Sequence, residues 1–274
     1  MPQGQRHAPL ARRAVLPALA LAAWLALSNA TSAAPPPYDL GDAPDRTNHF
    51  AANMTAFGGV VPARYPTVFD PATGAPPGPL HANINGFWLG QAVTGEQDAD
   101  QLPDADAITN IDPPTNTPNR DRRDDGVPPV SPTINLPQCG QTQFRYIVTG
   151  AAAPPVGQAY VNVWFDWNRD GDWEDIFTCS TSTGALIVRE WAVQNQPVPV
   201  VAGSVVHATP LFPSMHSGQY RETWMRITIA EQPAPLNPAT GRADGRGPNT
   251  PYRLGETEDY FTVYVGPGST WRPQ

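Results

Sequence analysis

From residue 133 onward the chain consists of short segments in which apolar and polar residues alternate, separated by prolines and glycines. Residues 142–148 place aromatic and aliphatic side chains on one face, and residues 159–167 are apolar on both faces, as in a strand covered from both sides. Similar segments occur at residues 186–193, 204–209, 219–229 and 259–265. Six or seven such strands without a helical period predict an all-β fold.

Composition divides the chain into four regions. Residues 1–34 have the pattern of a signal peptide, and residues 267–274 form a tail. Residues 35–127 are rich in Pro, Asp, Asn and Gly and have few apolar runs, so we expect a loop-rich acidic region that cannot build a core by itself. Residues 128–266 hold the strands, and we expect an antiparallel β-sandwich there, with Ig-like or jelly-roll topology.

The first 34 residues predict export. Three arginines are followed by an apolar run at residues 14–27 and then by small residues up to Ala34. These are the parts of a cleavable signal peptide, and the run is shorter than the roughly 20 apolar residues that span a bilayer. We expect cleavage between Ala30 and Ala34, no membrane span in the mature protein, and a secreted, extracellular or cell-surface location in a bacterium.

All 17 basic residues are arginines, and 25 residues are acidic. Removal of residues 1–34 takes away three arginines and no acid, so the net charge changes from −8 to −11. This charge argues against a nucleic-acid partner and favours cations. Because the chain has no lysine, it has neither a Walker A loop nor a pyridoxal Schiff base.

Cys139 and Cys179 are the two cysteines of the chain. In an oxidising compartment an even count predicts one disulfide, and two free buried thiols are the alternative. The bond would close a loop of about 41 residues, which the chain-entropy relation values at roughly 4 kcal/mol.

The segment after residue 165, DWNRDGDWED, is the strongest local signal for a metal. Oxygen-bearing side chains stand at alternate positions around a glycine, as in the first half of an EF-hand loop, but the twelfth position is Phe177 and not a glutamate. We expect a calcium loop completed by a carboxylate from elsewhere, with a polar hairpin turn as the alternative. The candidate ligands are Asp166, Asn168, Asp170, Asp172 and Glu174.

The last predicted strand begins with GETEDY at residues 255–260. In an extended segment Glu256 and Glu258 share one face, and the residues between and after them point to the other. Three carboxylates in four residues repel one another unless a cation or an arginine neutralises them. We expect Arg226 or the calcium of the 166–175 loop to do so, which adds Glu256 and Glu258 to the candidate metal ligands.

These elements resemble the GEVED domain, a β-sandwich module of bacterial extracellular and surface proteins. The resemblance covers residues 128–266 and rests on three elements in order: the Asp-x-Asn-x-Asp-Gly-x-Trp loop, an arginine-containing strand at 221–229, and the closing motif. The motif reads GETED, with Thr257 in the place of valine, and we expect an outward-pointing threonine to accommodate the change. The resemblance implies an accessory, non-catalytic module.

The N-terminal region has a resemblance of its own. Residues 38–45, YDLGDAPD, are similar to the DYGDAP segment found upstream of that module. Between Glu96 and Asp125 nine acids stand against three arginines, and hard oxygen ligands at this density suit calcium. An acidic, solvated linker is the alternative. The candidate calcium ligands here are Asp98, Asp100, Asp104 and Asp106.

The sequence contains no recognisable catalytic constellation. It has no HExxH, no Gly-x-Ser-x-Gly and no histidine pair with zinc spacing. Glu256 and Glu258 are neighbours on one strand, whereas a glycosidase pair must flank the sugar. Five tryptophans offer either a carbohydrate-stacking platform or ordinary core packing, which is the commoner use: Trp164, Trp167, Trp173, Trp191 and Trp224.

These features predict that the protein is not an enzyme but a secreted, calcium-stabilised structural or adhesion module. We expect its partners to be surface polysaccharide or other extracellular proteins. A carbohydrate-binding module acting at the cell surface is the second hypothesis, and a secreted hydrolase that uses carboxylates or a metal is the third.

Overall fold

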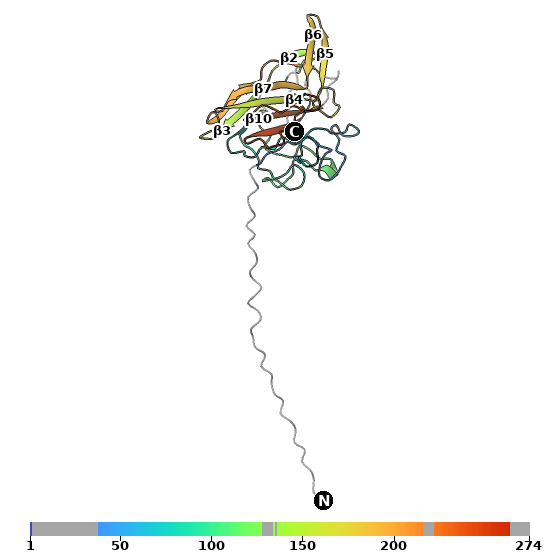
Figure 1. The fold of residues 1–274 in the computed structure, drawn as a ribbon, viewed down its shortest axis with the longest axis vertical. Coiled ribbons are helices and arrows are strands. Elements are labelled where there is room, and N and C mark those ends of the chain that lie inside the picture. The colour runs from blue at the N-terminus through green and yellow to red at the C-terminus, as the bar shows by residue number, and fades with distance from the viewer. Residues whose placement is uncertain (2–37, 128–133, 135, 216–221, 264–274) are drawn as a thin grey trace. The chain divides into compact units, whose positions relative to one another are not determined.

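In the computed structural model, contacts divide the chain into residues 1–34 and one compact unit, residues 35–274. The structure describes Met1 and residues 38–127, 134, 136–215 and 222–263 (Figure 1). The predicted signal peptide beyond Met1, the predicted tail, and the outer ends of the strands predicted at 219–229 and 259–265 lie outside the described residues.

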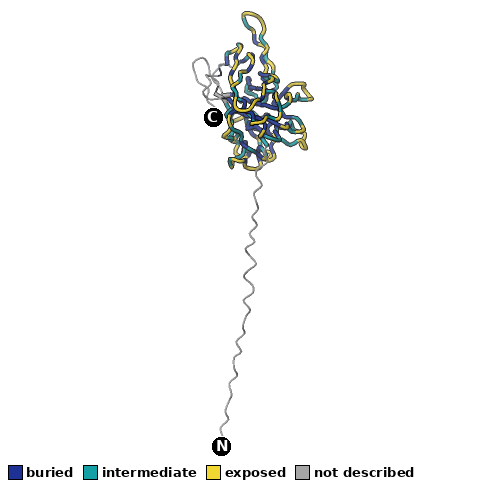
Figure 2. The backbone as a smooth tube through the Cα atoms, turned by 90° about the vertical axis from the view of Figure 1, so that its left-hand side faces the viewer, coloured by how far each residue is buried: buried dark blue, intermediate teal, exposed yellow. Residues whose placement is uncertain are grey.

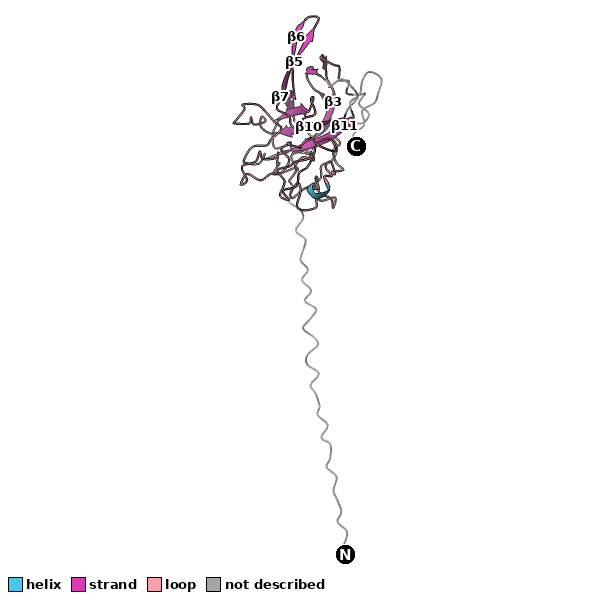
Figure 3. Ribbon diagram, turned by 90° about the vertical axis from the view of Figure 1, so that its right-hand side faces the viewer, coloured by secondary structure: helices cyan, strands magenta, loops and turns pink. Residues whose placement is uncertain are grey.

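The described part of the chain is mostly β, with no α-helix and one 3-10 helix at Pro113–Thr115 (Figure 3). All pairings between strands are antiparallel, so the all-β prediction is confirmed. The strands are β1 (Phe87–Leu89), β2 (Gly140–Thr142), β3 (Arg145–Gly150), β4 (Gln158–Phe165), β5 (Ile176–Thr181), β6 (Gly184–Arg189), β7 (Trp191–Pro199), β8 (Gly203–Ala208), β9 (Phe212–Ser214), β10 (Glu222–Ala230) and β11 (Gly255–Val263). No helix in the described residues is long and apolar enough to cross a membrane.

The strands form four sheets. A four-stranded sheet has the order β11-β10-β4-β7, and a three-stranded sheet has the order β1-β3-β8. Two short pairs, β2 with β9 and β5 with β6, complete the set. The β5–β6 hairpin projects beyond the other strands in both ribbon views (Figures 1 and 3).

The segment predicted as one strand at 186–193 contains the end of β6 and the start of β7. Glu190 separates them and is fully buried. Its carboxylate accepts the backbone N–H of Trp167 at 3.0 Å and of Asp175 at 2.9 Å. A buried acid that holds distant backbone explains the break, and hydrophobic alternation alone does not reveal it.

One face of the four-stranded sheet and the three-stranded sheet share an apolar core (Figure 2). Alternate residues of each strand point into it, as the period of two in a strand requires. The four-stranded sheet contributes Val161, Val163, Phe165, Val193, Val198, Met225, Ile227 and Ile229, and the three-stranded sheet contributes Phe87, Leu89, Tyr146 and Val148.

The opposite face of the four-stranded sheet is covered by the N-terminal region, residues 38–127, except for β1 and Val127, which belong to the core shared with the three-stranded sheet. Trp164 and Trp224 on this face belong to a second cluster whose other members come largely from that region, among them Leu40 and Tyr65. The loop-rich region therefore shares its core with the sheet instead of forming its own. This arrangement explains why the segment at 159–167 is apolar on both faces.

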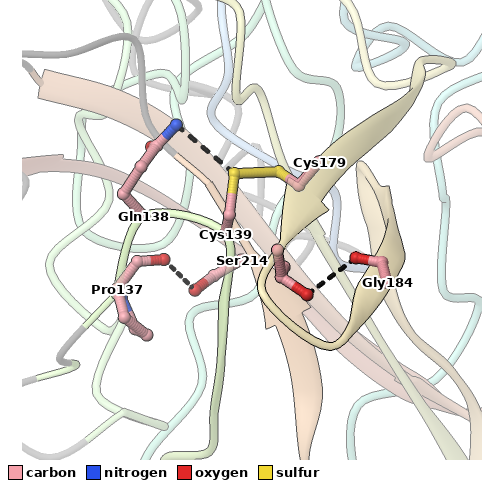
Figure 4. Close-up of a disulfide and its surroundings, with 7 residues drawn as sticks. Pro137, Gln138, Cys139, Cys179, Gly184 and Ser214 are labelled. Atoms are coloured by element: carbon pink, nitrogen blue, oxygen red, sulfur yellow. Dashed lines mark hydrogen bonds between the residues drawn. A yellow bond between two sulfur atoms is a disulfide. The ribbon is translucent and has the colours of Figure 1, made fainter.

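The predicted disulfide is present between Cys139 and Cys179, with 5.6 Å between their Cα atoms (Figure 4). It ties β5 of the projecting hairpin to the turn before β2. A hydrogen bond also holds this turn: the Ser214 hydroxyl donates to the Pro137 carbonyl at 2.8 Å. Because the chain has only these two cysteines, no thiol is left over. The disulfide is consistent with an extracellular location.

Candidate functional site

The closing strand β11 is an edge of the four-stranded sheet and pairs only with β10. From Glu256 to Asp259 its residues are at most 2% exposed. Glu256 and Glu258 share one face as predicted, since each accepts a hydrogen bond from the β1 side of the sheet. The expectation that Thr257 points outward is wrong, because the N-terminal region covers that face.

Arg226 stands opposite Asp259 in the register of β10 and β11 and is fully buried with it. Its Nε and Nη2 donate to the two carboxylate oxygens at 2.7 and 2.6 Å. The other N–H groups donate to the carbonyls of Pro66 and Gly245 and to the hydroxyl of Thr67. All five donors are satisfied, so Arg226 neutralises Asp259 as expected, and it also holds two loops, one at residues 66–67 and one at Gly245.

The carboxylate of Asp259 also binds the N-terminal motif. Its Oδ2 accepts the backbone N–H groups of Asp42 and Ala43, both at 2.8 Å and across 217 and 216 positions of sequence. A Cβ on Gly41 would collide with this oxygen and with the Arg226 guanidinium. Glycine is therefore required at this position of YDLGDAPD, and the two sequence motifs form a single structural element.

Glu256 and Glu258 also cap backbone N–H groups. Oε2 of Glu256 accepts from Leu89 at 2.5 Å, and Oε1 of Glu258 accepts from Gly126 at 2.8 Å. The Tyr260 hydroxyl donates to Oε2 of Glu258 at 2.7 Å. Burial raises the pKa of Glu258 to about 8 and that of Glu256 well above its usual value. Both side chains connect the closing strand to residues 89–126.

His81 lies beside Thr257, in a chain of hydrogen bonds. Its Nδ1 is 3.1 Å from the Leu254 carbonyl, and its Nε2 is 2.9 Å from the Thr257 hydroxyl, which is 2.9 Å from the Thr228 hydroxyl. A carbonyl only accepts, so Nδ1 carries the proton and Nε2 accepts from Thr257. Burial lowers the pKa of His81 to about 3, and its ring is neutral and fully bonded.

Asp166 is the centre of the 166–175 loop and is fully buried. Oδ1 accepts the N–H of Arg169 at 2.5 Å, while Oδ2 accepts the N–H of Gly171 at 3.0 Å and the hydroxyl of Tyr65 at 2.5 Å. Burial raises the pKa of Asp166 to about 7. Gly171 has φ of 92°, which gives the sharp turn predicted at this position. The side chain of Asp166 thus shapes the loop from inside.

The outer part of the loop gathers Asp170, Asp172 and Asp175, which can each place a carboxylate oxygen within 4.8 Å of the others. Nη2 of Arg64 lies 2.8 Å from Asp172 and 3.6 Å from Asp170. This cluster can hold a metal ion in competition with Arg64. Asp175 is not among the predicted ligands, although it belongs to the segment in which they were found.

The other predicted ligands of the loop have different partners. The amide of Asn168 donates to Asp175 at 2.6 Å. Glu174 accepts from the Asn237 amide and, at 3.1 Å, from the Thr240 hydroxyl. These two side chains stabilise the loop and its contact with residues 237–242.

The structure does not bring Glu256 and Glu258 to the loop. Both point to the β1 side of the four-stranded sheet, whereas Asp166 accepts from Tyr65 on the side of the N-terminal region. One strand also separates them, since β10 lies between β4 and β11. The carboxylate that the structure adds to Asp170 and Asp172 is Asp175, from the loop itself.

A second cluster that can hold a metal ion consists of His49, Asp98 and Asp100. Nδ1 of His49 is 2.7 Å from Asp100 and 3.9 Å from Asp98, and Nε2 is 3.7 Å from Asp70. Burial lowers the pKa of His49, but the hydrogen bond and charge of Asp100 outweigh it and raise the pKa. Sequence reasoning found the two aspartates and missed His49, which is about 50 residues earlier in the chain.

The remaining predicted ligands, Asp104 and Asp106, do not belong to this cluster. Asp106 accepts from the Ile108 N–H at 3.1 Å and lies 3.9 Å from Arg122. Asp104 is 7% exposed, and burial followed by the charge of Asp121 raises its pKa to about 8.

The tryptophans of the predicted platform are mostly core. Trp164, Trp167, Trp173 and Trp224 are at most 3% exposed, and only Trp191 is partly exposed. Trp164 and Trp191 stack at 6.2 Å on the face covered by the N-terminal region. The packing interpretation holds for the four buried side chains.

Comparison with known protein families identifies part of the chain. The family model of the GEVED domain matches residues 160–263, from within β4 to the end of β11. The chain carries a GEVED domain. The match includes the 166–175 loop, Arg226 and GETEDY, and it begins later than residue 128, where the sequence resemblance began. No curated protein matches the chain, and no solved structure does.

Within the GEVED domain, the closing motif connects the two halves of the protein. Three of its four central residues accept hydrogen bonds through carboxylates from backbone outside the match. The fourth, Thr257, also binds outward, since its N–H donates to Asp39 at 2.7 Å and its hydroxyl binds His81. Sequence reasoning found the motif but not these partners, which lie 130 to 220 positions away.

Proposed function

We propose that the protein is a secreted, non-catalytic structural or adhesion module whose β-sandwich, formed by the four- and three-stranded sheets, is stabilised by calcium. The observation that carries the proposal is the cluster of Asp170, Asp172 and Asp175 on the loop that leaves β4. Oxygen-only ligands of this kind suit calcium. The disulfide, the signal-like N-terminus and the net negative charge support work outside the cytoplasm.

The structural role follows from how the carboxylates are used. Asp166, Glu256, Glu258 and Asp259 are buried and accept hydrogen bonds that hold loops in place. A hydrolase of the third hypothesis would need such groups exposed to substrate. The carbohydrate-binding hypothesis has less support, because four of the five tryptophans that would carry it are buried.

Thermal unfolding of the secreted protein, in millimolar calcium and in chelator, tests the proposal. Extracellular calcium modules bind with dissociation constants of about 10⁻⁴–10⁻³ M. At a tenfold excess over that constant we expect a rise in Tm of about 3–5 °C. An unchanged midpoint contradicts calcium stabilisation. In the double variant Asp170→Asn/Asp172→Asn, the part of the rise due to the loop should disappear.

A further inference from the structure

A second group of acidic side chains lies inside the N-terminal region, near the contact with β11. It consists of five carboxylates and one amide: Asp42, Glu96, Asp104, Asn110, Asp121 and Asp124. Four of these residues are at least nine-tenths buried, with exposures of 0% for Glu96 and Asn110, 2% for Asp42 and 7% for Asp104. We call this group the internal acidic cluster.

Backbone hydrogen bonds bring the segments that carry these residues together. The N–H groups of Asn119 and Asp121 donate to the carbonyl and the carboxylate of Asp42, at 3.0 Å each. The Arg120 N–H donates to the carbonyl of Asn110 at 3.3 Å. The Leu40 N–H donates to Glu96 Oε2 at 2.6 Å. Residues 40–42, 96, 110 and 119–121 therefore lie side by side.

The cluster leaves buried oxygens without partners. Among the described residues, no donor reaches Oε1 of Glu96, either carboxylate oxygen of Asp104 or Oδ2 of Asp124. The side-chain amide of Asn110 interacts with the carboxylate of Asp42 and lowers its pKa, against the larger effect of burial. Leaving a buried polar atom unpaired costs free energy, so such atoms at one place indicate a group that binds them.

The charges of the cluster act on one another. After burial, repulsion by Asp121 is a cause of the raised pKa of Asp42, of Asp104 and of Asp124. It also contributes, behind Asp39, to the raised pKa of Glu96. Asp121 is thus close to all four of these carboxylates.

Arginine does not neutralise the cluster. Within the described residues, none of its five carboxylates forms an ion pair. Arg120, the nearest arginine in sequence, pairs with Asp112 at 3.3 Å, and the side chain of Arg122 is 72% exposed and approaches only Asp106. Within the described residues, no arginine therefore compensates the negative charge of the cluster.

We propose that the internal acidic cluster is a calcium site, distinct from the 166–175 loop, that ties the N-terminal region to the GEVED domain. All its ligand atoms would be hard oxygens from carboxylates and one amide, and calcium takes six to eight such ligands, whereas zinc and copper favour nitrogen and sulfur. The connection arises because Asp42, whose carboxylate belongs to the cluster, donates its N–H to Asp259 in β11.

Binding requires a small closing movement. In the described residues, no three carboxylates of the cluster already place an oxygen within 4.8 Å of one another, as those of the loop cluster do. An ion would draw the segments at residues 42, 96, 104 and 121 together. Calcium should therefore increase the protection of these segments from hydrogen exchange, in addition to raising the Tm.

The test compares two double variants of the whole secreted protein, using calcium alone as the probe. Glu96→Gln/Asp104→Asn removes two charges from the internal acidic cluster, and Asp170→Asn/Asp172→Asn removes two from the loop. Asp45→Asn is the matched control, because Asp45 is a buried aspartate whose two carboxylate oxygens accept hydrogen bonds from the backbone of Thr47, Thr67 and Val68. Bound calcium is measured by metal analysis and titration calorimetry, and Tm is measured in calcium and in chelator.

The internal variant is expected to bind fewer calcium ions than wild type and to lose several degrees of the calcium-dependent rise in Tm. In chelator it should be as stable as wild type or more stable, because two repelling buried charges are gone. A loss of stability in calcium without a loss in chelator distinguishes a cation site from acids that only stabilise the fold. The Asp45→Asn control should lose stability in both conditions and keep the calcium stoichiometry.

Two outcomes would overturn the internal site: unchanged stoichiometry in Glu96→Gln/Asp104→Asn, or an equal loss of Tm in calcium and in chelator. If the loop variant alone abolished calcium binding, calcium stabilisation would stand and the internal site would fall. If wild type bound no calcium, both would fall. The inference depends on the proposed function only in assuming exposure to extracellular calcium.

Discussion

The two faces of the four-stranded sheet are both buried but are held by different interactions. Ile227 and its neighbours on one face pack against the three-stranded sheet through apolar contacts. The preceding residue in the strand, Arg226, points to the other face and makes directed polar bonds to Asp259 and to Thr67 of the N-terminal region. Apolar packing tolerates small changes of shape, whereas a buried charge requires each of its partners.

This difference suggests why the N-terminal region needs so many buried acids. It has few large apolar side chains. Several residues that it contributes to the apolar cluster shared with the four-stranded sheet are alanines, such as Ala43, Ala56 and Ala63. Carboxylates that cap backbone N–H groups supply the order that a larger core would supply elsewhere. The apolar face should therefore respond mildly to trimming, and the polar face should respond strongly.

The largest effect is expected for Arg226→Met. The substitution keeps an unbranched, flexible side chain but leaves Asp259 buried without its cation, which should cost about 3–5 kcal/mol in the free energy of unfolding. Chemical denaturation measures it. Ile227→Val, at the adjacent position on the apolar face, should cost only about 0.5–1.5 kcal/mol.

Arg64→Met provides a control for the loss of an arginine. Arg64 also pairs with an aspartate at 2.8 Å, but its side chain is 45% exposed. An exposed pair should contribute about 0–1 kcal/mol. Equal costs for Arg64→Met and Arg226→Met would contradict the contrast between buried and exposed pairs.

The next effect depends on pH and tests the buried His81. Its pKa is about 3 in the folded protein, against 6.5 as the ordinary value, so between these values the unfolded chain binds a proton that the folded protein does not. The stability from this group is complete above pH 6.5 and falls as the pH is lowered. Between pH 6.5 and 4.5 the loss should be about 2–3 kcal/mol.

Denaturation of wild type and His81→Gln across this range measures the effect, because the difference between the two slopes removes the contribution of other groups. The wild type should lose stability more steeply on acidification. Parallel pH profiles would show that His81 is not the buried neutral group described here.

The third effect concerns the residue at which this chain departs from the GEVED motif. Thr257→Val restores the motif but removes the hydroxyl that donates to Nε2 of His81 and binds Thr228. One unpartnered buried acceptor should cost about 1–3 kcal/mol. In a His81→Phe background the acceptor is absent, so the same substitution should cost less, and an unchanged cost in this double-mutant cycle would refute the coupling.

Much of the fold follows from local patterns. Residues 159–167, with apolar side chains on both faces, were correctly expected to be a central strand, and β4 lies between β10 and β7. The failures have a common cause: Glu190 and Thr257 are polar residues buried by segments remote in sequence. A polar residue in a strand is assigned to solvent unless its distant partner is known.

The candidate site was only partly predictable for the same reason. The density of acids after Glu96 indicated cation binding, but the individual aspartates have different roles. Asp98 and Asp100 lie beside His49, Asp106 accepts from nearby backbone, and Asp104 is buried and repelled by Asp121. Their spacing in the sequence contains no information on which of them meet.

The sequence by itself determined the all-β class, the pairing of the two cysteines, the GEVED motifs and the shared face of Glu256 and Glu258. The fold class and the shared face depend on the two-residue period of a strand, the disulfide on the presence of two cysteines, and the GEVED motifs on short contiguous stretches of sequence. Only the tertiary structure decided that both faces of β11 are buried, that its carboxylates hold the N-terminal motif, and which acids are left unpartnered. The physical reason is that burial and hydrogen-bond partners are set by segments up to 218 positions away, and the local alternation of apolar and polar residues does not show where those segments pack.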